Sequence, residues 1–242
     1  AIIKHHSQCG LASAPTIEQA YERAYACDAE SAFGSVVGLN RPVEAGMAAR
    51  LTETFLEAIL APSVEPQAVL LFGKKPNLRV VTIEWPRALP AGREWRQLLG
   101  SWLLQDPDRM TAEAEPLKPV TRRVPTESER TDLLFAWKAV KQVKSNGVVL
   151  VSRCATVGIG QGQPSRVGSV RLAIEKAGAR SRQSVAASDG FFPFPDGVEL
   201  LAKAGVSAII QPGGSIRDAQ VVEAADRANL AMWLTGVRHF RH

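Results

Sequence analysis

Two spacings of apolar residues alternate along the chain. Residues 148–151 form an unbroken apolar run, typical of a buried strand. From Val167 to Ala177 an apolar residue recurs every three or four positions, which indicates one buried helical face. Thr16 and Thr126 are each followed three residues later by Gln or Glu, the capping-box pattern of a helix start. The same reasoning predicts further strands at 1–3, 36–37, 68–72, 79–85, 207–211 and 230–234, and helices at 16–27, 47–59, 126–140 and 198–204. Alternating strands and helices favour a three-layer α/β fold.

Prolines divide the chain into two parts. Residues 85–125 hold six of the fifteen prolines and few periodic segments, so we interpret them as a connection with one short buried piece at 100–104. The predicted first unit is therefore 1–125, connection included, and the second is 126–242. A strand, a glycine-rich turn and a helix follow one another in both halves, which hints at an internal duplication.

The stretch after the apolar run offers a first candidate site. Gly158, Gly160 and Gly162 predict a loop, and Pro164 suits the first helical position, where its missing N–H costs nothing. Such a loop points free backbone N–H groups at the positive end of a helix dipole, where anions bind. Arg166 adds a cation in the first predicted turn. The pattern predicts a site for a phosphate-bearing small molecule, although an ordinary strand–turn–helix unit explains it equally well.

Composition narrows the class of protein. A net charge of +5, scattered without interleaved aromatics, favours a local need for cations at an anionic substrate over nucleic-acid binding. Three cysteines without a CxxC pair indicate a reducing compartment and argue against structural zinc. No apolar run approaches the length of a membrane span and no secretory signal opens the chain, so we expect a cytoplasmic protein without a membrane partner. Because the chain starts inside an apolar run, it can be a fragment.

Two polar clusters carry candidate chemistry. Lys4-His5-His6 follows the first predicted strand, and histidine is the usual general acid or base near neutral pH. A solvated turn is the alternative. In residues 188–196 three aromatics stand among prolines and acids. A core plug is their commoner use; the other is a wall for a flat heterocycle, with Asp189 or Asp196 as a polar partner.

Short motifs also follow one another in a fixed order along the whole chain. They are Lys4-His5 with Cys9-Gly10, Asp28-x-x-Ser31-Ala32-Phe33-Gly34, Lys144-Ser145-Asn146, residues 156–163 with Ser165-Arg166-Val167, Ser188 to Phe194, Pro212 to Asp218, and Thr235-Gly236-x-Arg238-His239-Phe240. None is decisive alone. As an ordered set they resemble the AICAR transformylase domain of the bifunctional purine-synthesis proteins, which carry a fused IMP cyclohydrolase domain.

The resemblance implies a fold and an activity. The fold would be two tandem cytidine-deaminase-like three-layer α/β/α units without the deaminase zinc, in a homodimer with active sites at the subunit interface. The reaction, in de novo purine biosynthesis, would move a formyl group from 10-formyltetrahydrofolate to the 5-amino group of 5-aminoimidazole-4-carboxamide ribonucleotide. No metal would be required. A cyclohydrolase domain could lie in cis, outside this chain.

The resemblance also assigns residues. Lys4 and His5 match the catalytic pair, and Asn146 matches the asparagine that holds the reacting groups. The attacking amine is a weak nucleophile, so His5 would take its proton, while Lys4 and the Asn146 amide would stabilise an oxyanion. The remaining matches are, for the ribonucleotide, Arg166, Phe191 and Arg238, and, for the folate side of the site, Asp189, Phe194 and Asp196.

Departures from the family pattern keep two alternatives open. Ser7-Gln8 replaces Asn-Pro in the turn after His5, Gly168 and Gly190 replace other residues, and an upstream Arg-Tyr-Gly motif is absent from this chain. A misplacement of about 1 Å can cost two orders of magnitude in rate. The chain could therefore be an inactive or incomplete nucleotide- or folate-binding domain. A zinc deaminase is a third hypothesis, which the lack of a spaced His/Cys ligand pair disfavours.

Overall fold

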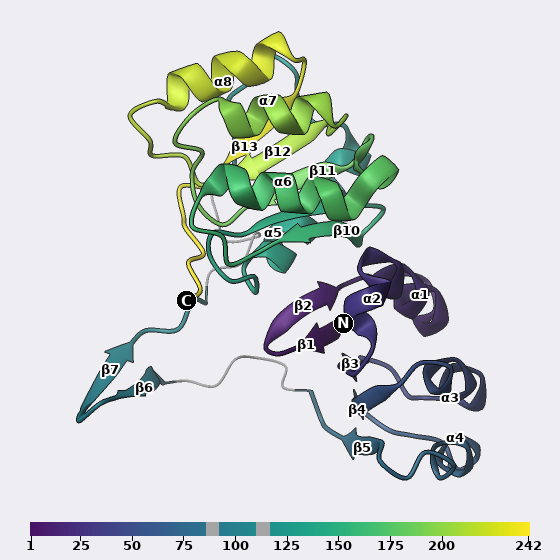
Figure 1. Ribbon diagram of the computed structural model, residues 1–242. Helices are drawn as coiled ribbons and strands as arrows, with labels where there is room; N and C mark the ends of the chain where they lie inside the picture. The colour runs from purple at the N-terminus through teal and green to yellow at the C-terminus, as the bar shows by residue number, and fades with distance from the viewer. Residues whose placement is uncertain (86–91, 110–116) are drawn as a thin grey trace.

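The computed structural model describes residues 1–85, 92–109 and 117–242, and contains two helix-covered sheets (Figure 1). The strands of the first sheet are β1 (Ile2–Lys4), β2 (Ser7–Gly10), β3 (Ser35–Gly38), β4 (Leu56–Ala61) and β5 (Arg79–Thr82). Its helices are α1 (Ile17–Cys27), α2 (Ala29–Ala32), α3 (Ala45–Thr52) and α4 (Pro66–Phe72).

The second sheet is built mainly from the C-terminal half. Its strands are β8 (Lys118–Pro119), β9 (Val148–Ser152), β10 (Ala155–Gly160), β11 (Val185–Ser188), β12 (Ala208–Gln211) and β13 (Ala231–Leu234). Its helices are α5 (Glu127–Val140), α6 (Arg166–Ala177), the 3₁₀ helix η1 (Gly178–Ser181), α7 (Asp196–Lys203) and α8 (Asp218–Arg227). The expected α/β class is therefore confirmed. The predicted unit boundary after residue 125 stays a prediction; β8, which precedes it, pairs with β13.

The two sheets share one topology. The first runs β2-β1-β3-β4-β5, and the second runs β10-β9-β11-β12-β13 with β8 added at its edge. In each, the first three strands pair antiparallel and the last three pair parallel. Helices α1, α3 and α4 occupy the connections that α6, α7 and α8 occupy in the second unit. This repeated order matches the internal duplication that the glycine turns suggested.

Residues on β9 show how the second unit buries both faces of its sheet. Because successive side chains on a strand point to opposite sides, Val149 and Val151 pack with Trp137 of α5, while Leu150 packs with Val170 of α6. Figure 1 shows α5 behind the sheet and α6, α7 and α8 in front of it. Thr126 begins α5 with the complete predicted capping box, its hydroxyl accepting from the Glu129 N–H and the Glu129 carboxylate accepting from the Thr126 N–H.

Backbone hydrogen bonds join the two units directly. Ala12 forms an isolated bridge with Ala155 of β10. Next to it, the Ser13 N–H donates to the Cys154 carbonyl at 2.9 Å, and the Thr156 N–H donates to the Leu11 carbonyl at 2.9 Å. The first sheet therefore reaches the edge of the second through the segment that follows β2.

A two-stranded hairpin, β6 (Glu94–Leu98) and β7 (Ser101–Gln105), extends away from both sheets (Figure 1). All of its strand residues are exposed, and Trp95, Leu99 and Trp102 are 64%, 106% and 63% exposed. The expected buried piece at 100–104 is thus wrong. The apolar residues 102–104 suggested burial, but their sequence does not identify a surface that would cover them.

Two predicted elements of the first unit are wrong. The helix predicted over 47–59 ends at Thr52; of the remaining stripe, Phe55 precedes β4 and Ile59 is buried on it. The strand predicted at 68–72 is α4, which begins with Pro66 in its first turn. A short apolar run fits a strand or a buried helix equally well. The other predicted strands and helices are confirmed in type within a few residues at their ends.

The glycine loop is also wrong in part. Gly158 and Gly160 lie on β10, and the helix that follows begins at Arg166 with Ser165 as its N-cap, so Pro164 precedes the helix. A Cβ on Gly160 would lie 1.9 Å from the Ser169 carbonyl oxygen of α6. At the equivalent place in the first unit, a Cβ on Gly10 would lie 1.9 Å from the Ala24 carbonyl oxygen of α1. These glycines permit close packing of helix on strand.

Among the described helices, none is both long and apolar enough to cross a membrane.

Candidate active site

The β1–β2 hairpin carries Lys4 and His5. Lys4 pairs with Ser7, so His5 and His6 form a two-residue turn, with φ of 51° and 62°. Both angles are positive, as in the type I′ turns that glycine and asparagine favour. The left-handed region costs roughly 1 kcal/mol or more for each such residue. Residues held in this way gather at functional sites, and both histidines are exposed to solvent.

A small cavity of about 210 Å³ adjoins this turn and is lined by Lys4, His5, Asp28, Gln161 and Lys176, among others. The Lys4 ammonium donates to the Phe33 carbonyl at 2.6 Å. The Lys176 ammonium donates to the Asp28 carboxylate. Burial alone would raise the Asp28 pKa, but hydrogen bonds from Lys176 and Ser31 lower it overall. Asp28 is therefore a paired carboxylate, and Lys4 is the cation beside His5.

A larger cavity of about 430 Å³ collects most of the other predicted residues. Its lining includes Asn146, Arg166, Phe191, Phe194 and Asp196. These come from the segment just before β9, the start of α6, the segment after β11 and the first residue of α7. Phe194 is 47% exposed. The stretch 188–196 therefore forms the aromatic wall of a pocket, the rarer of the two uses expected for it, although Phe192 is buried in the core.

Arg166 is held at the floor of this cavity by a buried ion pair. Its guanidinium donates to the carboxylate of Asp189, which is fully buried, and to the Gly147 carbonyl at 3.2 Å. Ser145 donates its hydroxyl to the other carboxylate oxygen of Asp189. The Arg166 Nε is buried without a hydrogen-bond partner among the described residues. Asp189 thus fixes the guanidinium and does not itself line the cavity, while Arg166 retains an N–H without a partner.

Asn146 is oriented by the backbone next to α6. Its Nδ2 donates to the carbonyls of Gln163 at 2.9 Å and Pro164 at 3.2 Å. The Ser145–Asn146 peptide bond is cis. With Nδ2 bonded to two carbonyls, the other polar atom of this cavity-lining side chain is Oδ1, an acceptor. The expected donor role of this amide therefore needs a different geometry from the one observed.

The two cavities are separate but joined by glutamines that sequence reasoning did not single out. The Gln161 side-chain amide donates to the Gln8 carbonyl at 3.4 Å, and the Gln163 side-chain amide donates to the Gln161 carbonyl at 3.2 Å. The Gln163 carbonyl in turn accepts from Asn146. A chain of hydrogen bonds therefore leads from β2, beside His5, to Asn146. Such bridging residues lack a local sequence signal.

Arg238 lies at the rim rather than on the lining. It is exposed, and its guanidinium stacks over the Phe240 ring at 5.3 Å from the centroid. Phe240, which does line the cavity, was not predicted. Neither was Arg217, whose guanidinium lies 4.3 Å over the Phe194 ring. The ordered glycine motif that contains Arg217 was a usable signal for it.

Electrostatics near the C-terminal tail favour a neutral histidine. Burial lowers the pKa of His239, and the opposing carboxylate of Asp108, 2.5 Å from Nδ1, does not fully restore it. The imidazole packs against Trp137 with ring centroids 4.5 Å apart. The backbone N–H of His239 donates to the backbone carbonyl of Asp189 at 3.0 Å, and this bond anchors the tail beside the Arg166 ion pair.

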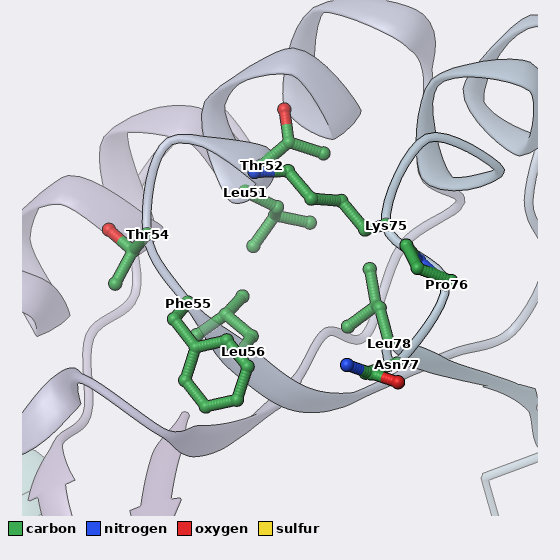
Figure 2. A pocket seen from close by; sticks show the side chains of 9 residues that line it. All are labelled: Leu51, Thr52, Thr54, Phe55, Leu56, Lys75, Pro76, Asn77 and Leu78. Atoms are coloured by element: carbon green, nitrogen blue, oxygen red, sulfur yellow. The ribbon is translucent and has the colours of Figure 1, made fainter.

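Two other findings bear on the chemistry. Within the described ranges, no three His, Cys, Asp or Glu side chains group closely enough to hold a metal ion. Figure 2 shows a further pocket, about 170 Å³, between the C-terminal ends of α3 and α4, with Leu51, Phe55 and Leu78 around it. None of the labelled residues there was predicted to be functional.

Fold and cavities define the class: a mixed α/β protein with a pocket lined by Arg166 and by the aromatic rings of Phe191, Phe194 and Phe240. The family profile described as AICARFT/IMPCHase bienzyme matches residues 1–176. The chain belongs to this family, as the ordered motifs predicted.

Curated relatives match the whole chain. Three proteins named bifunctional purine biosynthesis protein PurH are 47% identical in Nostoc sp. (strain PCC 7120 / SAG 25.82 / UTEX 2576), 48% in Cereibacter sphaeroides (strain ATCC 17029 / ATH 2.4.9) and 49% in Anaeromyxobacter sp. (strain Fw109-5). Each match covers 100% of this chain and 47–48% of the relative. The chain thus spans about half the length of the curated relatives. A solved structure titled protein ybgI, unknown function, is 13% identical with a TM-score of 0.21 over 84% of this chain and 72% of that one, too weak a likeness to bear on the fold.

Proposed function

We propose that this chain is a formyltransferase of purine biosynthesis, which moves the formyl group of 10-formyltetrahydrofolate to the 5-amino group of 5-aminoimidazole-4-carboxamide ribonucleotide. The observation that carries the proposal is the shared cavity of Asn146, Arg166 and Phe191 in a chain of this family. A fixed guanidinium suits a phosphate or carboxamide oxygen, and an aromatic wall suits a flat imidazole ring. The names of the relatives support a role in purine synthesis.

In the proposed reaction, the substrate amine attacks the formyl carbon and a C–N bond forms. His5 takes the proton that the amine loses, because an amine conjugated to a carboxamide is a weak nucleophile. Lys4 stabilises the oxyanion of the tetrahedral intermediate, a contribution of about 3 kcal/mol for one well-placed donor. The bond from the formyl carbon to the folate nitrogen then breaks, and His5 returns a proton to that nitrogen. No step uses a metal.

The observed orientation of Asn146 refines its proposed role. Because its Nδ2 hydrogens are donated to the Gln163 and Pro164 carbonyls, its Oδ1 is the group available to a substrate. An acceptor at this position would receive an N–H of the attacking amine and aim the nitrogen lone pair. Arg166 and Arg238 would bind the ribonucleotide and Phe191 would stack on it. Phe194 and Asp196, at the open side of the cavity, would contact the folate, with Asp189 acting through Arg166.

The proposed assembly is a homodimer with active sites at the interface. Two observations support it: His5 and Arg166 line different cavities of one chain, and the β6–β7 hairpin exposes Trp95, Leu99 and Trp102. A lone two-stranded hairpin is at best marginally stable in water, and exposed apolar surface of this kind marks interfaces. The fold proposed for the repeated topology is a tandem of cytidine-deaminase-like units. A cyclohydrolase domain in cis is proposed for the half of the relatives that this chain does not span.

A calorimetric titration and a turnover assay together distinguish an active formyltransferase from an inactive binding domain. We expect the ribonucleotide to bind in calorimetry and folate-dependent formylation to follow. We expect Arg166→Gln to weaken binding about tenfold or more, because it removes a charged hydrogen-bond donor. Arg171→Gln, on the exposed surface of the same helix, should bind normally. Ribonucleotide binding without turnover at saturation would favour the inactive or incomplete domain. If neither the wild type nor Arg171→Gln bound the ribonucleotide, the proposal would be refuted.

A further inference from the structure

A basic cavity of about 510 Å³ lies between the two units. Four arginines from separate elements line it: Arg23 of α1, Arg153 of the β9–β10 turn, Arg180 of η1 and Arg182 just after it. It does not belong to the proposed active site. Asn146 precedes β9 and Arg153 follows it, so the two residues are seven positions apart along an extended strand, roughly 20 Å.

Four arginines share this cavity with one carboxylate, that of Asp132, so the charge of its lining is net positive. Within the described ranges none of the four forms an ion pair. Asp132, the acidic residue of the lining, accepts instead from the backbone N–H groups of Arg153 at 2.8 Å and Cys154 at 2.6 Å. Both of its oxygens are therefore used to hold the turn.

Backbone contacts fix one of the guanidiniums in place. Arg180 donates to carbonyls at the C-terminal end of α1, at Ala26 and Cys27, and of α6, at Lys176 and Ala177. These carbonyls engage all three of its guanidinium nitrogens, so Arg180 adds fixed positive charge to the cavity wall and leaves direct phosphate contacts mainly to the other three arginines. Four like charges around one space repel one another, and a bound anion would relieve that repulsion.

The turn that presents Arg153 is held in an unfavourable backbone conformation. Arg153 and Cys154 have φ of 53° and 55°, and left-handed angles cost roughly 1 kcal/mol or more for each non-glycine residue. The equivalent turn in the first unit is His5–His6, which has the same geometry and adjoins the cavity of Lys4. Each repeat therefore holds a costly two-residue turn beside a cationic cavity, with a basic side chain on its first residue.

We propose that this cavity binds a ligand with two adjacent phosphate groups, either free diphosphate or the diphosphate of a nucleotide. Guanidinium groups match phosphate oxygens bidentately, and two linked phosphates offer more oxygens to such groups than one phosphate does. Four guanidiniums around one cavity therefore fit two linked phosphates better than one. The ligand would bind where the two units meet, apart from the site of formyl transfer.

Calorimetry with inorganic pyrophosphate, on the full chain at low salt, tests the proposal. Arg23→Gln and Arg182→Gln should each weaken pyrophosphate binding about ten- to hundredfold, because each removes a charge-assisted hydrogen-bond donor. Among the described residues, the Arg23 side chain donates one long hydrogen bond, to the Arg153 carbonyl at 3.4 Å, so its variant should keep the unliganded melting temperature. Arg171→Gln, outside the cavity, is the matched control and should bind pyrophosphate as the wild type does.

The ligand series identifies the chemistry. Pyrophosphate and ADP should bind more tightly than orthophosphate, and ADP binding tighter than pyrophosphate would assign the site to a nucleotide. Equal affinity for citrate at matched charge would overturn the phosphate assignment. If pyrophosphate does not bind, the proposed site is refuted. It is also refuted if Arg23→Gln and Arg171→Gln weaken pyrophosphate binding equally.

Discussion

Gly160→Ala tests whether the glycines of β10 serve packing or phosphate binding. An alanine Cβ at residue 160 would lie 1.9 Å from the Ser169 carbonyl oxygen, and ordinary contact begins near 3.4 Å. Strand β10 and helix α6 would therefore have to separate by about 1.5 Å, the difference between the two distances. The obstacle is backbone, so a rotamer change cannot relieve it.

The expected loss follows from that overlap. Overpacking a tight core typically costs about 1–3 kcal/mol, and a backbone clash belongs at the upper end, so we expect about 3 kcal/mol. For a chain of this size, that corresponds to a melting temperature lower by about 6–12 °C. Because α6 begins at Arg166, its displacement should also weaken ribonucleotide binding.

Gly162→Ala is the matched control. A Cβ there has nothing within 4 Å, but φ is +65°, so the cost is the left-handed conformation of alanine, about 1 kcal/mol. Circular-dichroism melts of both variants should show the larger drop for Gly160→Ala. Equal drops, or a normal melt for Gly160→Ala with lost ribonucleotide binding, would refute the packing interpretation and restore the phosphate cradle.

Two further predictions concern stability and assembly. Burial alone would raise the Glu129 pKa, but hydrogen bonds from Arg123 and Thr126 lower it from 4.5 to about 2. The lowered pKa stabilises the fold above pH 4.5, and that contribution is lost as pH falls toward 2; after allowance for screening at this partly exposed pair it is roughly 1–2 kcal/mol. Acid titration of unfolding should therefore be flatter in Glu129→Gln between those pH values, and an unchanged slope would contradict the linkage. For the proposed dimer, Trp102→Ser should raise the dissociation constant measured by sedimentation at least about tenfold, since burial of such a side chain contributes roughly 1.5–3 kcal/mol. The control variant Gln97→Ser should leave the dissociation constant unchanged. Equal effects of the two variants would contradict an interface at the hairpin.

Local rules explain which elements could be predicted. Helix α5 follows from Thr126 and Glu129, whose reciprocal capping needs only four consecutive residues. Strand β9 follows from an apolar run whose two faces are both buried. The glycines of β10 were misassigned because their requirement is tertiary. Only the approach of α6 reveals why a side chain at residue 160 is excluded.

For the candidate site, too, local sequence predicted some residues but not the tertiary contacts around them. The order of the motifs identified Arg166, Asn146 and Phe191, and these line one cavity. Their hydrogen-bond partners were beyond local reasoning, because the ion pair of Arg166 spans 23 residues to Asp189. Sequence spacing also could not show that Lys4 and His5 line a cavity of their own.

His5 is the base in the proposed formyl transfer, and its neighbour in the turn, His6, provides the control. His5 and His6 share one turn, are both exposed and both have positive φ, so replacing either removes one imidazole and leaves a similar backbone cost. The measurement is the steady-state rate of folate-dependent formylation by the purified chain. We predict that His5→Ala lowers kcat by about 10²–10⁴-fold, as loss of a general base does, while His6→Ala stays within a few-fold of the wild type. Equal rates for His5→Ala and the wild type would contradict the account.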